Sequence, residues 1–197
     1  HESISGIDKN RIMKFDDCVD KIRNIEMHNC CIRTELLRTN NVSCHEHLFY
    51  VDNEYVVYSL AYADTIVYLD LTVYQYLVGR NGQSVSIESR RRNHEQYMTV
   101  VNYLVGFYED VSWNLSEPKK RFIARKIAYF ITGVYSVMMS YRDAPHKNAL
   151  EQFDGWLREK SIDIYNGNNN ICVTMLRRTN MGMYGMASMI YRTVNRL

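Results

Sequence analysis

The sequence lacks an excess of charge of either sign. Its 197 residues contain 24 Lys and Arg against 22 Asp and Glu, and 46% of the residues are apolar. This length and apolar content suffice for one full domain or two small ones, and the composition is not that of a disordered protein. The near-neutral balance produces no field over the whole molecule of the kind typical of nucleic-acid-binding proteins. We therefore expect no nucleic-acid partner.

A long apolar run free of charge is also missing. The most apolar stretch, residues 122–139, approaches the length of a membrane span, but Arg125 and Lys126 lie inside it. This pattern favours a buried amphipathic helix. Residues 1–6 lack the charged start and apolar run of a secretory signal, so we expect none there. His1 in place of Met suggests a piece excised from a longer protein.

The cysteines are few and odd in number. There are five, and Cys30 and Cys31 are adjacent, which makes a mutual bridge between them sterically awkward. The pattern favours a reducing, cytoplasmic setting. The chain also shows no internal repeat or low-complexity tract.

The first part of the chain mixes helical and strand patterns. Apolar residues at spacings of three and four predict short helices over residues 15–25, 32–39 and 53–63. The β-branched and aromatic residues of 65–70 and 72–78 predict two adjacent strands, and thus a short β-hairpin. This part ends in a glycine-containing loop, which places a boundary near Ser86.

The second part shows helical periodicity alone. We expect a bundle of about four helices, at residues 87–111, 116–141, 148–160 and 174–196. Ser116 is suited to cap the second, because Glu117 and Pro118 fit its first turn. The expected fold class is therefore α+β, mainly α, with residues 1–85 and 86–197 as two domains.

Two acids, Asp52 and Glu54, stand just before the helix expected at residues 53–63, after an aromatic-rich stretch. Negative charge is stabilised at a helix start, so the structural interpretation of Asp52 is an N-terminal cap. The functional interpretation is a general base. Spacing alone favours the cap.

An ordered series of short motifs over residues 24–88 resembles the acceptor-side half of family 2 glycosyltransferases. The order matters more than any single piece, and the Gly-Arg-x-Gly-Gln-Ser loop after a Tyr-x-Tyr strand is the most specific part. The pieces are Met27-His28-Asn29, Ile32-Arg33-Thr34-Glu35, Phe49-Tyr50-Val51-Asp52, Ile66-Val67-Tyr68-Leu69-Asp70, Tyr74-Gln75-Tyr76 and Gly79-Arg80-Asn81-Gly82-Gln83-Ser84.

The resemblance implies a GT-A fold and a base at the start of a helix beneath the acceptor sugar. In the family an acidic pair, usually Glu-Asp, stands there and its Asp takes the acceptor proton, with inversion at the sugar carbon. Here the pair reads Val51-Asp52, so the base position is kept on Asp52 while the preceding acid is lost. Glu54, on the same stretch, could replace the missing acid, and it is also a candidate for binding the acceptor.

The same resemblance implies further contacts. The loop is similar to a segment that closes over the donor diphosphate, for which Arg80 and Ser84 are suited; the alternative is an exposed turn. His28, Arg33 and Tyr50 are the expected acceptor-side lining. A purely structural role for His28 is equally compatible with the sequence. Arg33 could instead form an ion pair with Glu35 or Asp52.

No metal site is expected in this chain. Cys44-His45-Glu46-His47 contains competent zinc ligands, but alternate residues of an extended loop point opposite ways. The family holds its divalent cation, Mn²⁺ or Mg²⁺, mainly through an Asp-x-Asp motif, and the sequence has none. The resemblance thus implies that the nucleotide-binding half precedes residue 1, that the cation and the nucleotide-sugar belong to the full-length enzyme, and that this piece alone is inactive.

Two stretches of the second part each allow a functional and a structural interpretation. Arg90, Arg91 and Arg92 share one helical turn, which suits anionic lipid headgroups or a phosphate-bearing acceptor, although a solvated helix face is the usual explanation. The stretch 181–189 is rich in Met and small residues, which favours core packing or a homo-oligomer contact over a ligand site.

The resulting hypothesis is that the full-length protein is a cytoplasmic enzyme, either dissolved in the cytoplasm or bound at the inner face of the membrane. It transfers a sugar from a nucleoside diphosphate donor to a glycan or cell-envelope acceptor. The rival is a non-catalytic helical module that contacts protein or membrane. The enzyme hypothesis requires Asp52, His28 and Arg80 to converge on one cleft edge, whereas the module lets them scatter.

Overall fold

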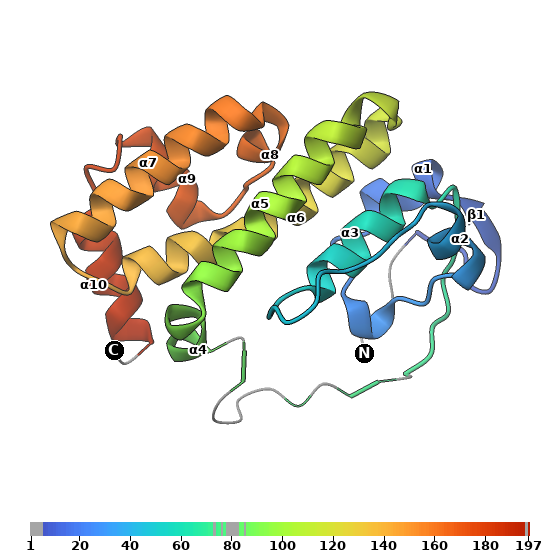
Figure 1. The fold of residues 1–197 in the computed structure, drawn as a ribbon, viewed down its shortest axis with the longest axis horizontal. Coiled ribbons are helices and arrows are strands. Elements are labelled where there is room, and N and C mark those ends of the chain that lie inside the picture. The colour runs from blue at the N-terminus through green and yellow to red at the C-terminus, as the bar shows by residue number, and fades with distance from the viewer. Residues whose placement is uncertain (1–5, 73, 76, 78–82, 85, 196) are drawn as a thin grey trace.

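The computed structural model describes residues 6–72, 74, 75, 77, 83, 84, 86–195 and 197. Ten α-helices and a two-stranded antiparallel sheet are found within these residues, so the fold is α+β and mainly α, as the sequence predicts. The N-terminal elements lie on the right of Figure 1 and the later helices on the left. Between them run α5 (His94–Val111) and α6 (Glu117–Met139).

The N-terminal part contains short helical segments around one longer helix. The apolar pattern at residues 15–25 yields only α1 (Phe15–Cys18) and a 3₁₀ turn, η1 (Val19–Lys21). A second 3₁₀ turn, η2 (Met27–Asn29), precedes α2 (Thr34–Thr39). The longer helix is α3 (Asp52–Tyr62), which starts one residue before its predicted position. It packs against both α5 and α6.

The sheet joins segments that are far apart in sequence. Residues 65–70 do contribute a strand, β2 (Thr65–Val67), but its partner is β1 (Ile12–Lys14), with Met13 opposite Ile66. The predicted partner was residues 72–78, whose described members form no strand. Strand β1 is only three residues long and has no alternating pattern of its own, so local sequence gives no signal for it.

The helices of the second part are more numerous than predicted. The single helix expected at residues 87–111 divides at Asn93 into α4 (Ile87–Arg92) and α5. Next come α6, α7 (Ala144–Lys160) and a short α8 (Ile162–Asn166), which the sequence analysis missed.

The helix expected at residues 174–196 is also two helices, α9 (Ile171–Arg178) and α10 (Tyr184–Val194). Between them Asn180 and Met181 have positive φ angles of 47° and 56°, which no α-helix tolerates. A Cβ atom on Gly182 would lie 2.9 Å from the Thr179 carbonyl oxygen, so only glycine fits this break.

Helix α6 is the centre of the fold. It contacts α3, α5, α7, α8 and α10. It is the one helix in the described part of the chain that is long and apolar enough to cross a membrane, yet 78% of its most apolar window is buried inside the protein. The prediction of a buried helix is confirmed. Ser116 stands at its N-cap position, but the hydroxyl donates to Asp16 Oδ1 at 2.7 Å instead of capping the helix.

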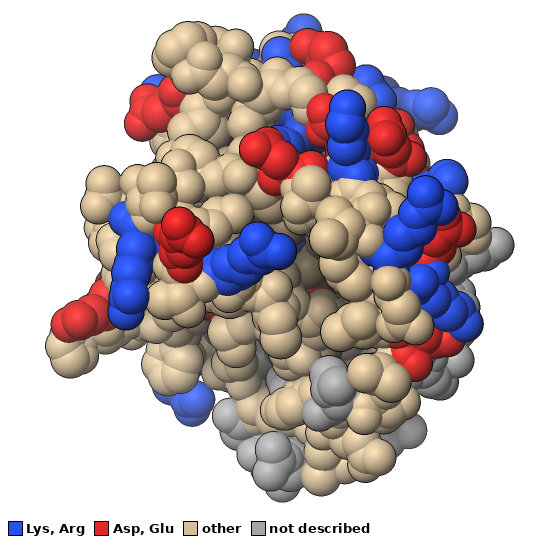
Figure 2. Space-filling model, turned by 90° about the vertical axis from the view of Figure 1, so that its right-hand side faces the viewer, with Lys and Arg blue, Asp and Glu red and all other residues tan. Residues whose placement is uncertain are grey.

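One buried cluster draws on both sides of residue 86. For example, the Phe15 ring meets the Phe122 ring edge-on, with 5.8 Å between centroids, and Tyr50 meets Tyr97 in the same way at 4.8 Å. The division into domains at residues 1–85 and 86–197 stays a prediction. On the face shown in Figure 2, basic and acidic residues are interspersed and form no large patch of one sign.

Candidate functional site

Asp52 is the first residue of α3 and is partly buried. Its Oδ1 accepts a hydrogen bond from Asn53 Nδ2 at 3.1 Å, and the backbone amides of Asp52 and Asn53 also donate to the carboxylate. Burial raises the pKa of the Asp52 carboxyl and the negative charge of Glu26 raises it further, against smaller opposing contributions from backbone amides and Lys126. A carboxylate in this setting holds a proton more tightly than one in water, which suits a general base.

Glu26 and Lys126 give this carboxylate charged neighbours that the sequence analysis did not identify. Lys126 comes from the middle of α6 and its side chain is only 3% exposed, while Nζ lies 3.2 Å from Glu26 Oε2. A buried ammonium group requires such a partner. Glu26 thus brings a second acid to Asp52 from a distant segment, although position 51 carries a valine. The available signal was the presence of charged residues, Arg125 and Lys126, inside the most apolar stretch of the chain.

Tyr50 and Ser84 connect two of the motifs that carry the resemblance. The Tyr50 hydroxyl donates to the Ser84 carbonyl oxygen at 3.1 Å, across 34 residues of sequence. Tyr50 has a positive φ of 73°, and its ring packs against Tyr97. Burial raises the pKa of its phenol, so the hydroxyl remains a donor at neutral pH. The end of the loop therefore lies beside the residue two positions before Asp52.

The other predicted lining residues lie at the surface. His28 is exposed on η2, next to α3, with its ring centroid 5.4 Å from that of Tyr74. Arg33 is exposed at the start of α2. Arg80 lies outside the described residues. The expected convergence of Asp52, His28 and Arg80 on one cleft edge thus stays a prediction.

Glu54 is held in place by His45. Its side chain is fully buried, and both carboxylate oxygens face His45: Oε2 accepts from the backbone amide at 2.9 Å, and Nδ1 lies 3.1 Å from each oxygen. The His45 ring in turn stacks on Tyr103 at 3.7 Å. The Glu54 carboxylate is thus occupied by His45, and the acceptor contact expected for it stays a prediction. Glu54 anchors the loop that precedes α3.

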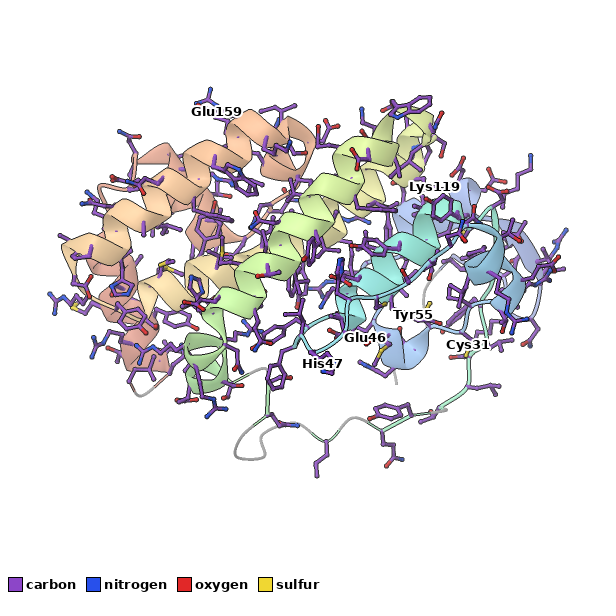
Figure 3. All side chains as sticks on the ribbon, in the orientation of Figure 1. Cys31, Glu46, His47, Tyr55, Lys119 and Glu159 are labelled. Carbon is purple, nitrogen blue, oxygen red and sulfur yellow. The ribbon has the colours of Figure 1, made fainter. Side chains whose placement is uncertain are left out.

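The neighbouring residues of that loop do not gather around His45. The side chains of Glu46 and His47 are 89% and 96% exposed and project from the loop into solvent (Figure 3). Among the described residues, no group of three or more His, Cys, Asp or Glu side chains is placed to hold a metal ion.

The three arginines of α4 also differ from one another. Arg91 Nε donates to Ser140 Oγ at 2.7 Å, and its guanidinium lies over the Tyr141 ring at 4.3 Å, so this residue ties α4 to the end of α6. Arg90 is partly buried, and Arg92 is exposed. The turn is therefore not a uniform solvated face.

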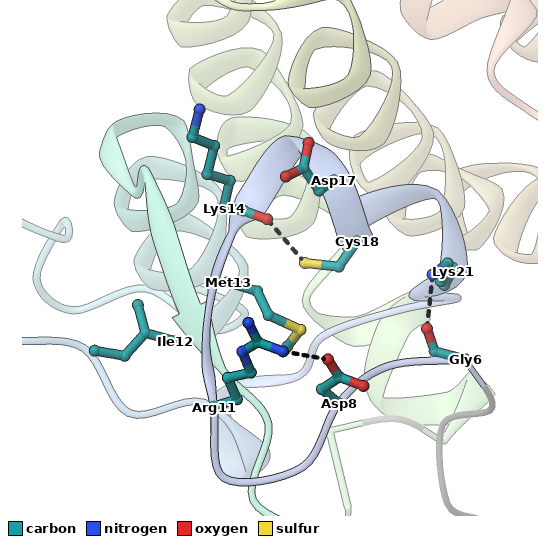
Figure 4. Close-up of a pocket in the computed structure, with 9 residues that line it drawn as sticks. All are labelled: Gly6, Asp8, Arg11, Ile12, Met13, Lys14, Asp17, Cys18 and Lys21. Atoms are coloured by element: carbon teal, nitrogen blue, oxygen red, sulfur yellow. Dashed lines mark hydrogen bonds and ion pairs between the residues drawn. The ribbon is translucent and has the colours of Figure 1, made fainter.

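Two hollows of the surface lie apart from Asp52. One, of about 400 Å³, is enclosed by the β1 and α1 region, where Arg11 pairs with Asp8 and Lys21 Nζ donates to the Gly6 carbonyl oxygen at 2.7 Å (Figure 4). The other is a groove of about 440 Å³ between α3, α5 and the loop after α2, lined by aromatic and amide side chains. None of the predicted site residues that the structure describes lines either hollow.

A scan against models of known protein families finds no match, and searches of curated proteins and of solved structures find none either. What this chain does must therefore be argued from its own residues and from the resemblance of its motifs.

Proposed function

We propose that the chain is the carboxyl-terminal part of a glycosyltransferase that resembles family 2, with residues 1–85 in a GT-A-like catalytic domain and residues 86–197 in a helical domain. The full-length enzyme transfers a sugar from a nucleoside diphosphate donor to a glycan or cell-envelope acceptor. The observation that carries the proposal is the environment of Asp52. It is a partly buried carboxylate at a helix start, and its pKa is raised by burial and by Glu26.

The proposed chemistry is a direct displacement. The acceptor hydroxyl gives its proton to Asp52 as its oxygen bonds to the anomeric carbon, and the bond from that carbon to the nucleoside diphosphate breaks. The diphosphate leaves with the electron pair, and the sugar carbon is inverted. A raised pKa improves a carboxylate as proton acceptor, because its proton affinity moves closer to the operating pH.

The Tyr50–Ser84 hydrogen bond supports a donor-side role for the loop. It holds Ser84 beside Tyr50, two residues before Asp52. The proposed contacts of the donor diphosphate are Ser84 and Arg80. His28, Arg33, Tyr50 and Glu54 remain proposed acceptor contacts. The described side chains do not fit a divalent cation, so we assign no step of this chain to Mn²⁺ or Mg²⁺. The cation and the nucleotide are proposed to bind in the half that precedes residue 1.

A non-catalytic interaction module is the second candidate, and one observation favours it. Helix α10 presents a row of exposed apolar side chains: Met186 is 51%, Met189 47%, Ile190 53% and Val194 75% exposed. Such a row suits a homo-oligomer or a peripheral membrane contact. The proposed location is the cytoplasm or the inner face of the membrane, which fits five free thiols.

The test uses the full-length gene product with a panel of nucleotide-sugars and Mn²⁺ or Mg²⁺. Donor binding, donor hydrolysis and transfer are measured for the parent, for Asp52→Asn and for Glu109→Gln, an exposed carboxylate on α5. We expect Asp52→Asn to bind donor normally and to lose transfer by roughly 10²–10⁴-fold, the range for loss of a general base. Equal transfer by parent and Asp52→Asn would reject the assignment, and no turnover of any donor would favour the interaction module.

A further inference from the structure

The groove between α3 and α5 has a lining that the proposed transfer chemistry does not use. These helices lie side by side in Figure 1 and are in contact. Tyr58 and Tyr62 face the groove from successive turns of α3, and Tyr103, Gly106 and Phe107 face it from α5. Its volume of about 440 Å³ falls in the range of small-molecule sites, about 300–1,000 Å³.

The aromatic rings of the groove are fixed in position. The Tyr58 ring packs on Phe107 with 4.3 Å between centroids, and Tyr62 meets the same ring at 6.3 Å, nearly perpendicular. Tyr103 is held from the other side by its stack on His45, which the buried Glu54 holds in turn. Tyr103 is still 38% exposed, so part of a rigid ring is presented to a ligand. Preorganised aromatic surface of this kind binds apolar faces at low entropic cost.

Polar groups lie beside these rings. Asn41, Asn102 and Asp110 line the groove and are exposed, and none of their side chains hydrogen-bonds to another described residue. Two amides and a carboxylate supply both donors and acceptors. Gly106 lies among them, and a Cβ atom there would meet no other atom within 4 Å, so the middle of the groove is open.

This combination selects among ligand classes. Among the described lining residues none is Lys or Arg, and Asp110 adds negative charge, so an anionic ligand is disfavoured. A planar base stacks on an open ring face, but one face of Tyr103 is already covered by His45 at 3.7 Å. A sugar ring has an apolar C–H face that fits against aromatic rings and hydroxyls that pair with amides and a carboxylate.

We propose that the groove lined by Tyr58, Tyr62, Tyr103, Gly106, Phe107 and Asn102 is a binding site for a neutral carbohydrate. The sugar's C–H face lies on the aromatic rings, and its hydroxyls hydrogen-bond to Asn41, Asn102 and Asp110. The inference does not depend on transfer at Asp52. If both hold, the two sites share α3, with Asp52 at its first turn and the groove along its later turns.

The test is a direct binding measurement on this chain. Maltotriose, cellotriose and chitotriose are titrated at millimolar concentrations while amide and side-chain NMR signals of α3 and α5 are followed. Glucose 1-phosphate is the anionic comparison. At least one neutral trisaccharide should shift Gly106 and the Asn102 side-chain amide, with glucose 1-phosphate weaker. If no neutral trisaccharide shifts them, the proposal fails.

Variants separate the groove from nonspecific binding. Tyr103→Ala removes the exposed ring, and Tyr129→Ala removes a 66% exposed tyrosine from α6 as the matched control. Gly106→Leu fills the groove with a residue that favours a helix, and it provides a second test if Tyr103→Ala does not fold. Gly155→Leu is its control, because a Cβ atom there also meets nothing within 4 Å. Tyr103→Ala and Gly106→Leu should each weaken binding by about tenfold or more, and the controls should not. Unchanged affinity in Gly106→Leu overturns the proposal.

Discussion

Lys126 Nζ lies 3.2 Å from Glu26 Oε2, and the two partners differ sharply in burial: the lysine side chain is 3% exposed and the glutamate side chain 36%. The pair joins the middle of α6 to the segment before η2. It also sets the charge around Asp52, whose pKa responds to both residues.

The unequal burial predicts unequal effects of removing each partner. Glu26→Gln leaves a buried ammonium group without its carboxylate and should cost about 2–4 kcal/mol of unfolding free energy. Lys126→Met fills the same space with an apolar side chain, and Glu26 can turn to water, so we expect a cost of about 1 kcal/mol or less. Urea denaturation of both variants measures the difference. A larger loss in Lys126→Met would contradict this account of the pair.

The raised pKa of Asp52 predicts a pH-dependent effect of Asp52→Asn on stability. The folded pKa lies above the ordinary value of 3.8, so the native state holds this proton more tightly than the unfolded state. The stabilisation by protonation is complete below that value and is lost as pH rises through the folded pKa. Asparagine does not titrate. The variant should therefore gain stability relative to the parent as pH rises through this window, by about 1.4 kcal/mol per unit of pKa difference.

Urea unfolding at a series of pH values tests this sign. The difference at acid pH is the baseline, because it contains the changes in hydrogen bonding that do not depend on ionisation. If the variant instead loses stability relative to the parent as pH rises, the ionised Asp52 carboxylate stabilises the start of α3 more than burial destabilises it. The alternative interpretation of Asp52 as a helix cap is then correct.

Tyr50→Phe should loosen the end of the 79–84 loop. It removes the hydroxyl that donates to the Ser84 carbonyl oxygen, which should cost about 1 kcal/mol. The amide of Ser86, which donates to the Gln83 carbonyl oxygen at 3.0 Å, should then exchange faster with solvent. Hydrogen exchange followed by NMR reports on this amide. Tyr129→Phe on α6 is the matched control, and equal exchange in both variants would mean that the hydrogen bond does not order the loop.

Cys30 should react slowly with alkylating agents. Burial raises the pKa of its thiol to about 11, with Cys31 adding to the increase, so at pH 8 little of it is thiolate. Cys31 is exposed. Iodoacetamide labelling of Cys31→Ser and Cys30→Ser, read by mass spectrometry of the peptide, separates the two rates. Equal labelling of the two positions would show that Cys30 is more accessible than the fold indicates.

Local sequence predicted most of the helices. Residues 116–141 contain α6, and residues 53–63 cover α3 except its first residue, because helical periodicity and end signals act over a few residues. The pattern failed where a local break was needed. Asn180, Met181 and Gly182 interrupt a stretch that reads as one helix, and Asn93 separates α4 from α5.

Some residues of the candidate site were likewise recognisable from local sequence, and others were not. Asp52 was identifiable because it stands at a predicted helix start, and Tyr50 because it lies in the same motif. Glu26 and Lys126 were missed because they meet only in the folded chain, 100 residues apart in sequence. The contact of both Glu54 oxygens with His45 was missed as well, because no local signal in the sequence indicates it.

The sequence by itself therefore determined a mainly helical α+β chain, a buried apolar α6 and a carboxylate at the start of α3. Only the tertiary structure decided that β1 pairs with β2, that Lys126 and Glu26 surround Asp52 with charge, and that Tyr103 and Phe107 line a groove with α3. The physical reason is range. Periodicity and capping act between neighbours in the chain, whereas ion pairs, strand pairing and grooves depend on segments that folding brings together.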